Sequence, residues 1–64
     1  MDFSKIQEIR IAKKMTQNEL AQKVGVTREH VSAIENGRKV PSISLLQKIA
    51  DVLACLLVDL LSKN

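Results

Sequence analysis

The sequence is almost without aromatic side chains, and it has little cysteine and no long apolar run. Phe3 is the only Phe, Tyr or Trp among the 64 residues, so the core must be aliphatic. The single cysteine, Cys55, cannot form an internal disulfide, whereas small secreted domains usually depend on several. The apolar run from Leu53 to Val58 is much too short to cross a bilayer, and no basic-then-apolar leader opens the chain. These observations favour a soluble, cytoplasmic protein with no membrane partner.

The side-chain groupings that enzymes and metalloproteins need are also missing. One His and one Cys cannot form a zinc site, and the sequence contains no plausible nucleophile–base set and no Gly-rich phosphate loop. A chain this short buries only about 60% of the surface that its unfolded form exposes, which leaves little room for a catalytic cavity. We therefore expect a single domain over residues 1–64 that is not an enzyme and takes no metal and no cofactor.

Positive charge is concentrated in the first two-thirds of the chain. Eight lysine or arginine residues and four glutamates lie between Lys5 and Lys39, whereas basic and acidic residues balance from Val40 onward. A positive field in the first region suits a polyanionic partner there, although many solvated helical faces are basic for no such reason.

Apolar residues recur at helical spacing, and no segment alternates as a strand does. The first recurrence predicts an amphipathic helix over residues 3–13, with inward side chains from Phe3, Ile6, Ile9 and Ala12. Another helix is expected after Ser42, which can cap it, and a short last helix around Leu57 to Leu61. Their boundary stays open, because Ala54-Cys55-Leu56 has no glycine, proline or strong cap. The sequence thus predicts an all-α, compact bundle of four to five short helices.

Two capped helices are expected in the middle of the chain, joined by three residues. Thr16-Gln17-Asn18-Glu19 has the pattern of a capping box, in which the threonine and the glutamate each bind the other's backbone amide. Gly25 stands where this helix should end, because glycine tolerates a positive φ. Thr27 can cap a second helix from Arg28 to Asn36. Two helices joined by a short turn that contains glycine form a helix-turn-helix.

The second helix of this pair has two contrasting faces. At about 100° per residue, Val31 and Ile34 fall on one side of it. The opposite side carries a stripe of small or hydrogen-bonding side chains, namely Arg28, Glu29, Ser32, Ala33 and Asn36. A helix that reads base edges in the major groove needs such a stripe.

These features resemble the lambdoid phage repressor and Cro family, often called XRE-type helix-turn-helix proteins. The resemblance runs from about Ile6 to Leu61. The positions that carry it are Thr16-Gln17-Asn18-Glu19-Leu20-Ala21, Gly25-Val26-Thr27, Ser32, Ile34-Glu35-Asn36-Gly37-Arg38 and Pro41-Ser42. It implies a lambda-repressor-like DNA-binding domain and a transcriptional regulator, in particular a repressor that binds an inverted-repeat operator in double-stranded DNA as a homodimer.

The resemblance also implies roles for individual residues. The expected base contacts are Arg28, Glu29, Ser32 and Ala33, and the expected phosphate contacts are Gln17, Thr27, Asn36, Arg38 and Lys39. Alternatives stay open for two of these residues: Arg28 and Glu29 could form only a solvated first turn, and Glu29 could serve only to orient Arg28 or to repel phosphates. Arg10 and Glu35 occupy positions at which the family often forms a buried ion pair, with a phosphate contact by Arg10 as the alternative.

The C-terminal segment departs from the family pattern. Ala54 and Leu56 stand where relatives usually have a glycine and then a polar cap. A helix that is apolar all round must be buried, yet a domain this small cannot bury every side of it. We expect the surplus face to form a homodimer interface of Leu56, Leu57, Val58 and Leu61. Alternatively, the preceding helix continues and these side chains pack within one chain.

A function of another class is compatible with the same sequence. Some proteins of this family are antitoxins of toxin–antitoxin pairs or adaptors, and their main partner is another protein. A toxin or an enzyme that copurifies through the Leu56 to Leu61 face would favour that alternative. Cys55 is expected to be a small buried hydrophobe rather than a redox group.

Overall fold

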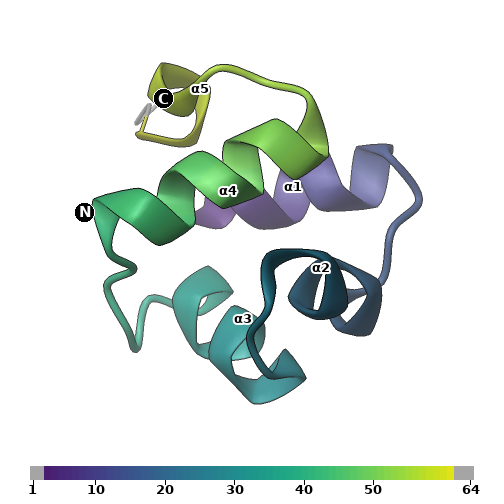
Figure 1. The fold of residues 1–64 in the computed structure, drawn as a ribbon, viewed down its shortest axis with the longest axis vertical. Helices are drawn as coiled ribbons and strands as arrows, with labels where there is room; N and C mark the ends of the chain where they lie inside the picture. Colours follow the sequence, from purple (N-terminus) through teal and green to yellow (C-terminus); the bar gives the residue numbers. More distant parts are fainter. Residues whose placement is uncertain (1–2, 62–64) are drawn as a thin grey trace.

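The computed structural model describes residues 3–61, and its regular structure in that range is entirely helical. The elements are α1 (Ser4–Ala12), α2 (Gln17–Val24), α3 (Arg28–Glu35), α4 (Ile43–Leu53) and α5 (Leu57–Leu61). Helices α2 and α3 lie at one end of the molecule and α5 at the other, with α1 and α4 between them (Figure 1). The expected all-α bundle is confirmed. Residues 1, 2 and 62–64 of the expected domain lie outside the described part, in which no helix is long and apolar enough to span a membrane.

Three helices begin at the hydroxyl caps that the sequence predicts. The Thr16 hydroxyl accepts the Glu19 amide at 3.0 Å, and Glu19 Oε1 accepts the Thr16 amide at 2.8 Å, so the capping box is complete. Thr27 caps α3 and Ser42 caps α4, each accepting the amide three residues on at 3.1 Å. Each cap satisfies one of the amides that a helix start leaves without an intrahelical partner.

Two helices end in the left-handed backbone region. Gly25 ends α2 at φ 81°, as the sequence predicts. Ala54 ends α4 at φ 56° and ψ 44°, although it is not a glycine. The amide of Cys55 then donates to the Ala50 carbonyl at 3.0 Å, which closes the helix end. The fourth helix therefore stops at Leu53 and a separate α5 follows, as expected, so the alternative in which the fourth helix continues is wrong.

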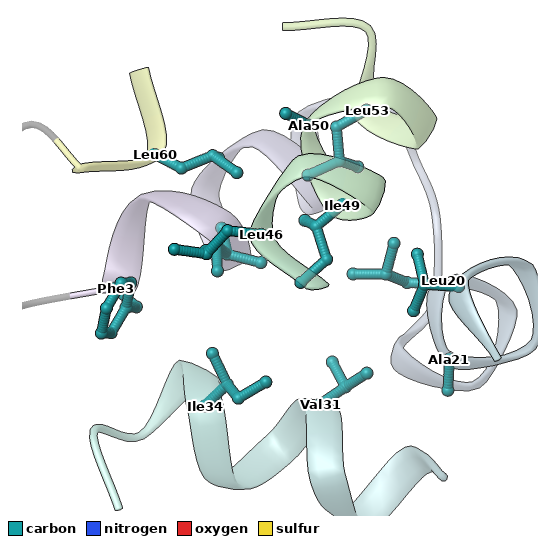
Figure 2. Close-up of a cluster of buried hydrophobic side chains, with 12 residues drawn as sticks. Phe3, Leu20, Ala21, Val31, Ile34, Leu46, Ile49, Ala50, Leu53 and Leu60 are labelled. Carbon is teal, nitrogen blue, oxygen red and sulfur yellow. The ribbon is translucent and has the colours of Figure 1, made fainter. Parts of the chain in front are cut away.

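The core is aliphatic apart from Phe3, and the residues of both the first and the last helical segments enter it. Figure 2 shows Val31 and Ile34 pointing from α3 towards Leu46 and Ile49 of α4. The buried apolar set is Phe3, Ile6, Leu20, Ala21, Val24, Val31, Ile34, Leu46, Ile49, Ala50, Leu53 and Leu60. Ala12, expected to face inward, is exposed instead. Helix α1 ends at that residue and the chain turns at Lys13 and Lys14, so the apolar face of α1 stops one turn earlier.

Candidate nucleic-acid interface

Helix α3 packs against the core through one face only. Ala21 of α2 is buried where α2 packs on α3, and its small side chain permits close approach. In the turn between them, the Val26 amide donates to the Ala21 carbonyl at 3.0 Å and the Val26 side chain packs against the core. Val31 and Ile34 are buried on the inner face of α3. The opposite face of α3 is therefore exposed, and the packing of the inner face fixes its position.

The four predicted base-contacting residues lie along that outward side. Arg28 and Glu29 are exposed in the first turn, and Ser32 and Ala33 are half-buried one turn later. Arg28 Nη2 lies 3.4 Å from Glu29 Oε2, so the two charges touch loosely at the surface. This contact is compatible with Glu29 orienting Arg28, the alternative left open by the sequence. At the other end of α3, Asn36 Nδ2 donates to Ser32 Oγ at 3.3 Å.

The predicted phosphate-contacting residues flank this face. Arg38 and Lys39 are exposed on the connector after α3, and their amides donate to the Ala33 carbonyl at 2.8 and 3.2 Å. The connector therefore folds back over the end of α3 and keeps both cations beside it. Thr27 is exposed at the start of α3, with its hydroxyl engaged as the cap. Asn36 is exposed at the end of the same helix.

Arg10 and Glu35 form the buried ion pair that the resemblance implies. Arg10 Nε donates to Glu35 Oε2 at 2.7 Å and Nη2 donates to Oε1 at 3.2 Å. The two side chains are 9% and 0% exposed. Arg10 Nη1 donates to the Met15 carbonyl at 2.7 Å, so all three guanidinium nitrogens act within the protein. A buried pair contributes little net stability, but removing one partner alone is costly.

Gln17 belongs to this network, and the sequence gives no direct sign of it. Its Nε2 donates to Glu35 Oε1 at 3.0 Å from the first residue of α2. The two residues are 18 positions apart on different helices, so helical periodicity cannot pair them. Gln17 is half-buried, which places it between the buried ion pair and the surface.

The C-terminal apolar residues divide into two groups. Leu60 is fully buried, and Leu57 and Leu61 are partly buried against the core. Leu56 and Val58 are 68% and 63% exposed. The exposed apolar surface at Leu56 and Val58 is therefore smaller than the predicted four-residue interface. A second exposed apolar pair, Val40 and Ile43, lies around the start of α4, and the sequence pattern does not predict it.

Cys55 is partly buried and packs against the core, as expected of a small hydrophobe. Burial raises the pKa of its thiol, and the neighbouring carboxylate of Asp59 raises it further. The thiol is therefore a weak nucleophile near neutral pH.

Comparison with known proteins places this geometry in a family. The family model described as helix-turn-helix matches residues 6–60. An HTH-type transcriptional regulator of Archaeoglobus fulgidus is 46% identical over 57 residues, which make up 89% of this chain and 81% of the relative. Another from Bacillus subtilis is 39% identical over 56 residues, 88% of this chain and 85% of that one.

A solved structure agrees with these relatives. The clp gene regulator ClgR from Corynebacterium glutamicum matches with a TM-score of 0.87 and 31% identity. The match covers 91% of this chain but only 62% of the ClgR chain, so this chain spans less than two-thirds of that protein. The fold and the motif that the sequence indicates are thereby confirmed. The chain belongs to the XRE-type helix-turn-helix family of DNA-binding transcriptional regulators.

Proposed function

We propose that this protein is a sequence-specific repressor that binds an inverted-repeat operator as a homodimer, with α3 in the major groove. The observation that carries the proposal is the outward face of α3, whose opposite face is fixed in the core. The major groove of B-DNA admits an α-helix and presents a distinct pattern for each base pair. There Arg28 reads guanine O6 and N7, Glu29 accepts from a cytosine amino group, and the Ala33 methyl contacts a thymine methyl.

The backbone contacts come from residues around that face. Arg38 and Lys39 are exposed cations beside the end of α3, and Asn36 and Thr27 flank the helix. Together with Gln17 they set the register of α3 on the duplex, because phosphate contacts position a protein while base contacts specify the sequence. The concentration of positive charge between Lys5 and Lys39 supports the same assignment.

A dimer is proposed because one α3 reads only a few base pairs. The exposed side chains of Leu56 and Val58 form the centre of the proposed interface, with the half-buried Leu57 and Leu61 beside them. Two copies related by a two-fold axis place their recognition helices about 34–36 Å apart, one helical turn of DNA. The operator is then an inverted repeat with that spacing.

Selection of bound sequences from random duplex DNA tests this function with three proteins. The wild type should enrich an inverted repeat with half-sites about 10 base pairs apart. Arg28→Ala should relax the preference at one base pair of each half-site, at a cost of about 1–3 kcal/mol. Lys39→Ala should weaken binding to all sequences alike. The groove assignment is wrong if the wild type enriches no sequence, or if both variants retain the wild-type preference.

The exposed apolar residues also support a second function, that of a protein-interaction module such as an antitoxin or an adaptor. Leu56 and Val58 would then contact a different protein instead of a second copy. This alternative predicts that the purified chain is monomeric and that no duplex sequence is enriched. The oligomeric state and the enriched sequences can both be measured on the protein prepared for the selection experiment.

A further inference from the structure

The carboxylate of Glu35 is fully buried and accepts three hydrogen bonds. Two come from Arg10, and the third comes from Gln17 Nε2 at 3.0 Å. Within this group Arg10 and Glu35 are buried, whereas Gln17 is half-exposed. Gln17 is therefore the member of the group that reaches the surface, and it is among the residues proposed above to contact the DNA backbone.

The chemistry of the two neighbours fixes how Gln17 can act. A glutamine amide has a donor end and an acceptor end, whereas an ionised carboxylate only accepts. Glu35 therefore holds the nitrogen end of the amide. Unesterified phosphate oxygens also accept only, so Gln17 can bind a phosphate only through the same nitrogen. That nitrogen carries two hydrogens that point in different directions, so one is available for each partner.

We infer that Gln17 Nε2 bridges Glu35 and a DNA phosphate, and that the Arg10–Glu35 pair thereby positions the DNA backbone contact. The inference rests on the proposed function. The bond to Glu35 orders the Gln17 side chain before DNA arrives, which lowers the conformational entropy lost on binding. Both of its bonds have a charged acceptor, and such bonds are stronger than neutral ones. Glu35 thus affects DNA affinity without touching DNA.

The test uses Gln17→Met in two backgrounds. Methionine keeps the length and the apolar stem of glutamine but removes the amide. The second background is Arg10→Met/Glu35→Leu, because replacing both partners of a buried pair with apolar residues is often tolerated, whereas removing one is strongly destabilising. Circular dichroism with thermal unfolding verifies that each protein is folded. Gln22→Met, the same substitution at an exposed position of α2, serves as the matched control.

Fluorescence anisotropy measures the affinity of each protein for the selected duplex at one salt concentration. Gln17→Met should weaken binding about tenfold in the wild-type background and less than about threefold in the apolar background, because only in the first does Glu35 order the amide before DNA arrives. Gln22→Met should change the affinity by less than about twofold in both. Equal losses from Gln17→Met in the two backgrounds would overturn the coupling, and no loss in either would leave Gln17 a structural residue only.

A modified duplex separates a phosphate contact from a merely structural role. Single phosphates of the selected duplex are replaced with neutral methylphosphonate, one at a time. We expect one position in each half-site at which the replacement weakens the wild type but not Gln17→Met. The inference is wrong if both proteins are sensitive at the same positions. Failure of the proposed function is recognised differently, because the wild type then selects no duplex at all.

Discussion

At the scale of single residues, Ala54 shows how a helix can end in the left-handed region without a glycine. Its φ of 56° and ψ of 44° lie in the left-handed region, which costs a residue with a Cβ about 1–2 kcal/mol. The side chain is exposed, so packing of the methyl group does not require alanine at this position. The strain is a local cost that the packing of α4 and α5 offsets.

Ala54→Gly should therefore stabilise the protein by about 0.5–1 kcal/mol, since the relieved strain exceeds the added entropy of the unfolded chain. Ala12→Gly is the matched control, because Ala12 is also exposed but has an ordinary helical backbone in α1. That change should destabilise by about 0.5–1 kcal/mol. Urea unfolding measures both. If both substitutions changed the free energy of unfolding in the same direction, the role given to the left-handed conformation of Ala54 would be contradicted.

At the scale of the helices, the start of α2 depends on a carboxylate. The backbone amide of Thr16, and then its hydroxyl, lower the pKa of Glu19 from its ordinary value. A carboxyl with a lowered folded-state pKa stabilises the protein fully above the pKa of the unfolded chain, which is about 4.3 for glutamate. This stabilisation is lost as the pH falls through the folded-state pKa.

Glu19→Ala should accordingly cost more stability at about pH 7 than at about pH 3, with the two proteins converging on acidification. Glu19→Gln is the control: it can still accept the Thr16 amide, but it does not titrate. Its stability relative to Glu19→Ala should not change with pH. Thermal unfolding followed by circular dichroism measures all three proteins. A wild-type advantage over Glu19→Ala that is constant across this range would exclude the proposed linkage.

The same scale shows what the sequence can and cannot predict. The starts of α2, α3 and α4 are predictable because Thr16, Thr27 and Ser42 act on amides three residues away. The end of α4 is not, because tertiary packing forces Ala54 into a conformation for which alanine has no local preference. The hydrogen bond between Gln17 and Glu35 cannot be predicted either, because helical periodicity identifies the buried face of a helix but not the residues that this face contacts. The exposed stripe on α3 is predictable, and its partner in DNA stays a proposal.

At the scale of the whole molecule, α5 lies at the end away from α2 and α3 (Figure 1). Contact between two copies through Leu56 and Val58 therefore does not cover the exposed face of α3. Burying these two side chains on dimerisation removes apolar area from water, which is the main favourable contribution in most protein association. The proposed interface and the proposed recognition face are thus compatible in one molecule.

Sedimentation at micromolar concentration should show a dimer for the wild type. Leu56→Gln/Val58→Thr should weaken the dimer by on the order of tenfold or more, because two exposed apolar side chains are replaced by polar ones. Ile11→Gln is the control, since Ile11 is 58% exposed on α1, outside the proposed interface. A strictly monomeric wild type, or equal weakening by the control, would count against an interface on α5.

The two faces of α3 also affect how the sequences of such proteins diverge in evolution. Val31, Ile34 and Glu35 are tied to the core, so most changes there carry a stability cost. Arg28 and Glu29 are exposed and touch each other at the surface, and surface changes of this kind cost little. Under the proposed mode of DNA binding, point mutations at these two positions can therefore change the target site without compensating changes in the core. After gene duplication, two such chains would keep the same packed core while the exposed faces of their α3 helices, the proposed DNA-reading faces, change independently.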